Sequence, residues 1–251
     1  MQPSVAAAKP SIVKVAALCG SLRKFSCNRG IIRAESIQGM EIEYVDIAPL
    51  PFLNTDLEVD GTYPPAVEAF RRKILAADSI LFASPEYNYS VTGPLKNAID
   101  WASRPPNVWA DKPAAIVSAG GGFGGGRSQY HLRQMGVYLD LHFINKPELF
   151  IFEYQPPKKF DSVGNLIHQE SLERLKEVLL SLQAFTLRLK EYSRNTYFHI
   201  LQNTPKWDKF TPPLEHVWFG RNLVLNDGNF MILTAAYGGR CLLSQKNSEN
   251  P

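Results

Sequence analysis

The stretch IVKVAALCGSLRKFSCNRG, residues 12–30, joins an apolar run to a polar loop and decides how the chain folds. Residues 12–18 are apolar except for Lys14, which is typical of a buried strand. A loop containing two serines, an asparagine and Arg23 follows, and a helix is expected behind it. Free backbone N–H groups and the helix dipole favour an anion at such a helix start. The stretch therefore predicts a strand, an anion-binding loop and a helix.

Apolar runs alternate with helix-like segments through the first 190 residues. Strands are expected at 12–18, 41–47, 79–84, 114–119 and 141–144, with 148–152 as an extension or an extra strand. Helices are expected at 64–77, 93–103, 127–138 and 169–190, besides a short one starting near residue 28. This alternation predicts a parallel sheet covered on both faces. We expect an α/β, flavodoxin-like doubly wound sheet of five strands in the order 2-1-3-4-5.

Three polar or glycine-rich loops follow the first, third and fourth expected strands. Ligands of parallel sheets bind beyond the carboxyl ends of the strands, so we expect these loops to form one site. In the first loop Ser21, Ser26 and Asn28 are polar donors, and Arg23 offers a charge-assisted fork. Neither G-x-G-x-x-G nor G-x-x-x-x-G-K-[ST] is present, so a single terminal phosphate, as in FMN, fits best. The alternative is that Ser26 or Asn28 only caps the helix.

The other two loops favour a flat ligand. In SPEYNYSVTGPLKNAIDW (84–101), Glu86, Tyr87 and Asn88 offer backbone amides, an aromatic face and an amide side chain, which suit an isoalloxazine ring. In SAGGGFGGGRSQ (118–129), six glycines surround Phe123 and permit close approach of a ligand to the backbone. The ordinary alternatives are a surface loop with a buried tyrosine and a flexible linker.

The composition argues against several classes of protein. The chain has 251 residues, 45% apolar and 20% charged, which suffices for a packed core. A net charge of +3 without a Lys/Arg block gives no reason to expect nucleic acid. Its three cysteines, at 19, 27 and 241, form no disulfide or zinc framework, and its five histidines lack ligand spacing. With no signal-peptide pattern and no run of eighteen apolar residues, we expect a cytoplasmic protein without a transmembrane segment or a metal.

Three motifs together resemble the NADPH-dependent FMN reductase family: GSLRKFSCN (20–28), PEYNYSVTGPLKNAIDW (85–101) and SAGGGFGGGRSQYHLRQ (118–134). The resemblance extends over residues 12–190 and is closest to plant NADPH:quinone oxidoreductases and bacterial quinone and chromate reductases. It implies a flavodoxin-like fold, with FMN held non-covalently near a subunit interface. It also implies assembly as a homodimer or homotetramer.

The resemblance implies a set of cofactor-binding residues. The FMN phosphate would be held by Ser21, Arg23, Ser26, Cys27 and Asn28. The isoalloxazine and ribityl chain would contact Pro85, Glu86, Tyr87 and Asn88, and the other side would be closed by Ser118, Gly120, Gly121, Gly122 and Phe123. For the Cys27 thiol, a pKa lowered by the helix start and a simple packing role both stay open. Cys19 is expected in the core.

The implied activity is the oxidation of NAD(P)H coupled to the two-electron reduction of quinones. NADPH or NADH would pass a hydride to FMN and leave, and a quinone would then take it on the same face, in a ping-pong cycle. Two-electron delivery avoids a free semiquinone and would protect against oxidative stress. Hydride transfer itself needs no catalytic acid or base from the protein.

The chain departs from the family pattern in two places. Only RGIIRAESIQG (29–39) separates Asn28 from the second strand, about nine residues fewer than the family pattern implies, and a helix over 28–38 would span only about 16 Å. Its apolar face would be limited to Ile31, Ile32 and Ile37. The segment 191–251 has no counterpart; a hairpin of 217–225 with 230–236 is expected in it, and its end, SQKNSENP, is expected to be disordered.

These departures suggest an alternatively spliced or misannotated product. We therefore expect three parts: a flexible N-terminus (1–11), an FMN-binding reductase domain (12–190) and an atypical extension (191–251). The alternative function is that of a flavodoxin-like subunit with impaired FMN binding that acts only by pairing with normal subunits. An electron carrier is a weaker rival, because carriers of this fold are typically acidic and this chain is not.

Overall fold

The protein is described from a computed structural model that places residues 12–34, 36–203, 223–224 and 230–231. The predicted flexible N-terminus, residues 1–11, lies outside this range. Two compact units are present, Met1–Tyr197 and Phe198–Pro251, and the sheet and the site belong to the first.

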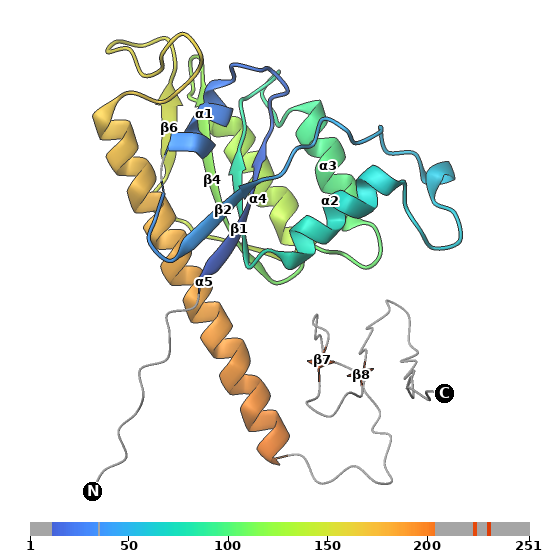
Figure 1. The fold of residues 1–251 in the computed structure, drawn as a ribbon. Helices are drawn as coiled ribbons and strands as arrows, with labels where there is room; N and C mark the ends of the chain where they lie inside the picture. Colours follow the sequence, from blue (N-terminus) through green and yellow to red (C-terminus); the bar gives the residue numbers. More distant parts are fainter. Residues whose placement is uncertain (1–11, 35, 204–222, 225–229, 232–251) are drawn as a thin grey trace, which may run out of the picture. The chain divides into compact units, whose positions relative to one another are not determined.

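The first unit is built on one parallel sheet (Figure 1). Its strands are β1 (Val13–Cys19), β2 (Met40–Tyr44), β3 (Ser79–Ala83), β4 (Lys112–Gly120), β5 (Leu141–Phe143) and β6 (Leu149–Phe152). They lie in the order β2-β1-β3-β4-β5, with β6 also paired to β4, and every pairing is parallel. The predicted fold class and strand order are confirmed.

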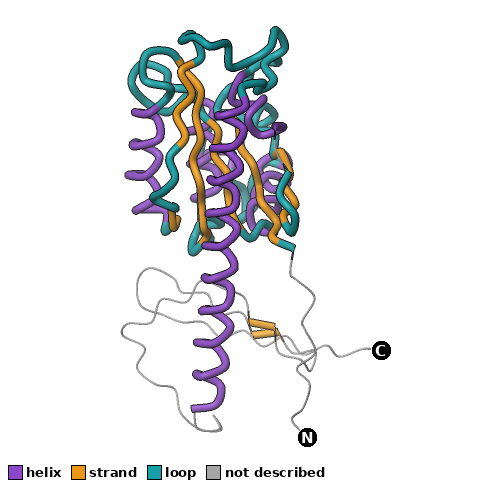
Figure 2. Tube along the Cα trace, turned by 90° about the vertical axis from the view of Figure 1, so that its left-hand side faces the viewer, coloured by secondary structure: helices purple, strands orange, loops and turns teal. Residues whose placement is uncertain are grey.

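Helices cover both faces of the sheet, as Figure 2 shows from the side. They are α1 (Cys27–Ala34), α2 (Pro65–Ala76), α3 (Gly93–Ser103), α4 (Gly126–Leu139) and α5 (Gln169–Asn203), with a short 3₁₀ turn η1 (Thr55–Leu57). Two buried clusters result: α1 and α5 pack on one face, and α2, α3 and α4 on the other. Alternate residues of β1 enter opposite clusters, Ala17 with α1 and α5, and Leu18 with the other three helices. This explains why β1 is apolar except for the exposed Lys14 near its start, rather than alternating.

Two short strands share one edge of the sheet. Residues Lys112–Ala114 of β4 pair with β5, and Val117–Gly120 pair with β6. The residues between β5 and β6, which include Pro147, leave the ladder. β6 thus continues the edge that β5 begins, which is the extension predicted for residues 148–152.

The helices that begin and end this unit differ most from ordinary lengths. α1 has 8 residues, and its expected apolar side chains, Ile31, Ile32 and Ile37, are all buried, the last just beyond the helix. α5 has 35 residues and continues past the predicted end at Lys190. No glycine or proline occurs between Gln169 and Asn203, so nothing in this segment ends the helix. The predicted domain boundary at Lys190 therefore lies inside a helix.

Little of the chain beyond α5 is described. β7 (Leu223–Val224) pairs antiparallel with β8 (Phe230–Met231), and both lie within the two strands predicted for the hairpin. The other predicted hairpin residues and the closing SQKNSENP are outside the described residues. In the described part of the chain, no helix is both long and apolar enough to cross a membrane.

Candidate active site

Three loops meet beyond the carboxyl ends of β1, β3 and β4: the first loop (20–26), the second loop (84–92) and the third loop (121–125). The Thr92 hydroxyl donates to the Gly20 carbonyl at 2.5 Å, which joins the first loop to the second. The Arg127 N–H donates to the Glu86 carboxylate at 2.9 Å, which joins the second loop to the segment after the third. The loops that the sequence placed at one site are therefore in contact.

Two glycines permit this close approach. A Cβ on Gly20 would lie 2.3 Å from the Ser84 hydroxyl oxygen. A Cβ on Gly125 would lie 2.6 Å from the Ser118 Cβ. Gly125 also has a φ of +84°, a conformation in which a residue with a side chain is strained. A larger residue at either position would have to displace Ser84 or Ser118.

The first loop ends in a capped helix start. The Ser26 hydroxyl accepts the Arg29 N–H at 3.4 Å, so Ser26 caps α1, as the alternative interpretation had it. The Ser26 carbonyl accepts the Gly30 N–H at 2.9 Å. The backbone N–H groups of Cys27 and Asn28 donate to no other described residue, as expected for the first turn of a helix. These two donors remain available to an anion.

Ser21 and Arg23 lie beside these donors. The Ser21 hydroxyl is buried and accepts the Arg23 N–H at 3.3 Å. The Arg23 guanidinium is exposed, donates to the Phe25 carbonyl at 2.9 Å and has no ion pair with a described carboxylate. The first loop thus carries a positive charge that no described side chain neutralises.

The Asn28 side chain braces α1 against β4. Its Nδ2 donates to the Ala119 carbonyl and its Oδ1 accepts the Ala119 N–H, both at 2.9 Å. β3 pairs with β4 only as far as Val117, so the carboxamide takes the place of the next peptide of β3. Asn28 was predicted as a phosphate ligand; its amide oxygen and one amide N–H are used by the backbone, while its own backbone N–H remains.

The surroundings of the Cys27 side chain favour the protonated thiol over the thiolate. Its Sγ donates to Glu153 Oε1 at 3.1 Å. Burial, together with the hydrogen bond and negative charge of Glu153, raises the pKa of Cys27 to about 12. The possibility of a lowered pKa is therefore wrong, because burial and the carboxylate outweigh the helix start. Cys19 is buried in the core as predicted, and burial raises the pKa of its thiol.

The second loop closes in a tight turn. Asn88 and Tyr89 both have positive φ, 49° and 68°, and Tyr87 and Ser90 exchange two hydrogen bonds of 3.0 Å. This is the geometry of a type I′ turn. Tyr87 is 52% exposed rather than buried, and Asn88 is exposed with it, while Pro85 and Glu86 are half-buried at the base. The loop therefore presents an aromatic face at its tip.

The third loop is held from beneath by buried side chains. The Ser118 hydroxyl donates to the Gly124 carbonyl at 2.6 Å, and Gln129 Nε2 donates to the Ser118 hydroxyl at 2.8 Å. Phe123, at the tip, is 59% exposed. Gly120, at the end of β4, is half-buried, and Gly121 and Gly122 are exposed, with no atom within 4 Å of a Cβ built on Gly122. The loop is a fixed turn with an open glycine face, not a flexible linker.

Arg127 connects the tips of the second and third loops. Its guanidinium lies 3.6 Å from the centre of the Tyr89 ring and 3.7 Å from that of Phe123. The same guanidinium pairs with Glu86. Cation–π contacts on both sides fix the spacing of the two tips. Sequence reasoning missed Arg127, although a charged residue directly after a glycine run was a usable signal.

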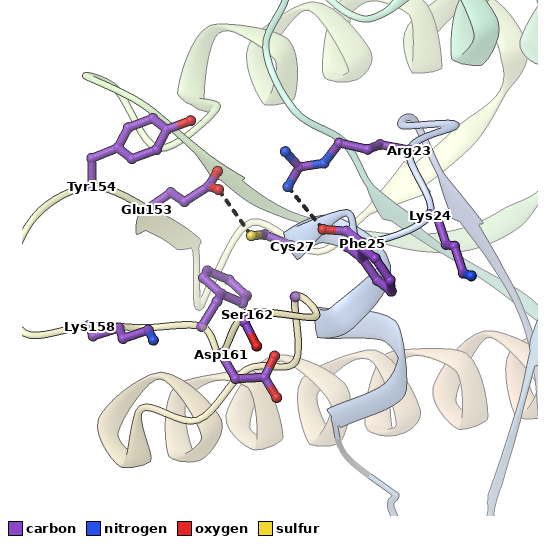
Figure 3. Close-up of a pocket in the computed structure, with 11 residues that line it drawn as sticks. Arg23, Lys24, Phe25, Cys27, Glu153, Tyr154, Lys158, Asp161 and Ser162 are labelled. Atoms are coloured by element: carbon purple, nitrogen blue, oxygen red, sulfur yellow. Dashed lines mark hydrogen bonds between the residues drawn. The ribbon is translucent and has the colours of Figure 1, made fainter.

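A cavity of about 390 Å³ lies between the first loop and the segment after β6 (Figure 3). Its walls include Arg23 and Cys27 from one side and Glu153, Tyr154 and Lys158 from the other. Sequence reasoning missed Glu153, which lies 126 residues from its partner Cys27, and no local pattern indicated it. Among the residues with described placement, no group of three or more His, Cys, Asp or Glu side chains could hold a metal ion.

Comparison with known proteins agrees with this architecture. A family model described as NADPH-dependent FMN reductase matches residues 13–155. An NADPH:quinone oxidoreductase of Arabidopsis thaliana is 70% identical over 193 residues, which cover 74% of this chain and 98% of that relative. A quinone reductase of Escherichia coli (strain K12) is 40% identical over 184 residues, covering 71% of this chain and 97% of the relative.

Among solved structures, the flavoenzyme NAD(P)H:(acceptor) oxidoreductase FerB from Paracoccus denitrificans aligns with a TM-score of 0.60 and 29% identity. The alignment covers 72% of this chain and 98% of FerB. The alignment with the Arabidopsis relative also shows that this chain is shorter than that relative within the aligned region. The Arabidopsis alignment takes 193 residues but uses only 74% of the chain, about 186 residues, so about seven residues of the relative have no counterpart here.

Proposed function

Because the chain belongs to the NADPH-dependent FMN reductase family, we propose that it is an FMN-dependent NAD(P)H:quinone oxidoreductase. The observation that carries this proposal is the meeting of three loops around a helix start with free N–H groups, in a chain 70% identical to an NADPH:quinone oxidoreductase over almost that relative's full length. The cofactor is FMN, and NAD(P)H is the co-substrate.

The residues present fit the FMN phosphate. Two free backbone N–H groups, of Cys27 and Asn28, adjoin the buried Ser21 hydroxyl and the unneutralised charge of Arg23. Helix starts with such donors bind phosphate, and an arginine adds charge-assisted hydrogen bonds. Ser26 supports this site as the helix cap rather than as a free hydroxyl.

We place the isoalloxazine and ribityl chain at the second and third loops. Pro85, Glu86, Tyr87 and Asn88 would lie on one side, and Ser118, Gly120, Gly121, Gly122 and Phe123 on the other. When bound, FMN supplies two-electron hydride acceptance and donation. The chain's own residues position the ring: Arg127 sets the spacing of the tips, and the open glycine face leaves room for a flat ligand.

We further propose ping-pong kinetics, in which the nucleotide and the quinone use the same face in turn, and a role in protection against oxidative stress through two-electron reduction. Steady-state rates at several fixed quinone concentrations test the first point. Parallel lines in double-reciprocal plots against NADPH support it, and intersecting lines refute it.

The competing proposal is a subunit with impaired FMN binding that acts only by pairing. The short α1, with 8 residues, and the approximately seven unmatched residues of the Arabidopsis relative favour it. The purified chain decides between the two. A yellow flavin spectrum and quinone-dependent NADPH oxidation support the enzyme, whereas a folded, colourless and NADPH-inert protein supports pairing without catalysis.

A cytoplasmic location and assembly as a homodimer or homotetramer complete the proposal. The two described cysteines, Cys19 and Cys27, are free thiols, in keeping with a reducing compartment. Light scattering coupled to size exclusion measures the assembly state directly, and a monomer at micromolar concentration would contradict it.

A further inference from the structure

The cavity beside the first loop is not used by the proposed FMN site beyond Arg23 and Cys27. Lys24 and Phe25 of the first loop also line it, and the opposite wall is the segment after β6, with Glu153, Tyr154, Lys158 and Asp161. At about 390 Å³ it is within the range of small-molecule sites. Figure 3 shows side chains from both walls pointing toward one another across it.

The cavity adjoins the flavin loops on two sides. Arg23 belongs both to the first loop and to the cavity wall. Tyr154 lies against the third loop, because a Cβ built on Gly121 would be 3.8 Å from its ring. The Glu153 N–H also donates to the Gly120 carbonyl at 2.9 Å. A ligand that reaches the flavin ring over the glycine face can therefore extend into this cavity.

The charges in the cavity favour an anion. The cavity is lined by three cationic side chains and two carboxylates: Arg23, Lys24 and Lys158, and Glu153 and Asp161. Glu153 is occupied by the Cys27 thiol. The N–H groups of Asn165 and Val163 donate to Asp161 Oδ1, and these hydrogen bonds hold the pKa of Asp161 below its usual range.

One cation is left without a close partner. Lys24 lies over the Phe25 ring at 5.3 Å, and Arg23 donates to a backbone carbonyl. Lys158 makes no ion pair or hydrogen bond with any described residue, although its charge helps to lower the pKa of Asp161. In Figure 3 its amino group points toward Asp161 and Ser162. The exposed rings of Phe25 and Tyr154 add flat apolar surfaces of the kind on which a purine stacks.

We infer that this cavity binds the phosphorylated adenosine half of NADPH and that Lys158 contacts the phosphate that distinguishes NADPH from NADH. The inference rests on the proposed function, since it names the part of the co-substrate that lies beyond the flavin. It makes Lys158 a specificity-determining residue for NADPH over NADH.

The test uses the full chain saturated with FMN, in wild-type form and as Lys158→Ala, with Lys159→Ala as the matched control. Lys159 is the neighbouring lysine and does not line the cavity. Calorimetry measures the binding of adenosine 2′,5′-bisphosphate and of adenosine 5′-monophosphate. We expect wild type to bind the bisphosphate at least tenfold more tightly, and Lys158→Ala to lose about tenfold of that affinity, as for one charge-assisted contact.

Kinetics provide the second measurement. The ratio of KM for NADPH to KM for NADH should rise about tenfold in Lys158→Ala and stay constant in Lys159→Ala. Equal binding of the two adenosine nucleotides by wild type, or unchanged bisphosphate affinity in Lys158→Ala, overturns the inference. Bisphosphate binding by a chain that takes up no FMN supports the cavity assignment and refutes the proposed enzyme instead.

Discussion

Replacing Asn28 by alanine tests the brace that joins the short α1 to the sheet. The side chain is 3% exposed and makes two hydrogen bonds of 2.9 Å to the backbone of Ala119. Alanine would leave the Ala119 N–H and carbonyl without partners in the core. A buried polar group without a partner costs roughly 1–3 kcal/mol, and limited water entry from the loop edge offsets part of this. We expect Asn28→Ala to lower the free energy of unfolding by about 2–4 kcal/mol.

Urea unfolding followed by far-UV circular dichroism measures this loss. Asn54→Ala is the matched control, because Asn54 is exposed and accepts one hydrogen bond of 3.0 Å from the Asp56 N–H. The control should lose less than about 1 kcal/mol. If Asn28→Ala unfolds within about 0.5 kcal/mol of wild type, the carboxamide does not replace a strand peptide and the reasoning is wrong.

Three further changes follow from the site. Gly30→Ala should prevent stable folding, because its Cβ would lie 1.7 Å from the Gly164 carbonyl oxygen; a normal thermal transition would contradict this. Glu153→Gln should speed alkylation of Cys27 by iodoacetamide near pH 9, because it removes the negative charge that, with burial and the hydrogen bond, raises the pKa of the thiol to about 12. Peptide mass spectrometry follows that reaction, and burial should still keep the pKa above that of a free thiol, so an unchanged rate refutes the role of Glu153. Arg127→Met should weaken FMN binding about tenfold, since two cation–π contacts at roughly 0.5–1 kcal/mol each are lost; flavin fluorescence quenching measures it, and an unchanged dissociation constant counts against Arg127.

The strands and the site loops were largely predictable from the sequence because their signals are local. Burial on both faces makes β1 apolar from Val15 to Cys19, and the loops after β1, β3 and β4 meet because parallel strands end together. The end of α5 was not predictable from resemblance to shorter relatives. The sequence from Gln169 contains no Gly or Pro before Pro205, and this pattern, which allows the helix to continue past Lys190, was present in the sequence but was not used.

The roles of single side chains were harder to predict. Asn28 fitted a phosphate ligand by type, yet its amide is used by the Ala119 backbone 91 residues away. The position of Cys27 at a helix start allowed a lowered pKa of its thiol, but burial and Glu153 raise that pKa instead. Both outcomes depend on groups that only the tertiary fold brings close, so spacing along the chain could not indicate them.

The two edges of the sheet also affect how copies of the chain could associate. β5 and β6 expose only short ladders of three and four residues, separated by a segment with Pro147, which has no N–H to donate. On the opposite side, β2 carries the exposed charged residues Glu41 and Glu43, the second paired with Lys73, and charged side chains on an edge strand discourage strand addition. Neither border is a good template for adding a foreign strand. Addition of a further strand at either border of this sheet, and fibre growth along it, is therefore disfavoured.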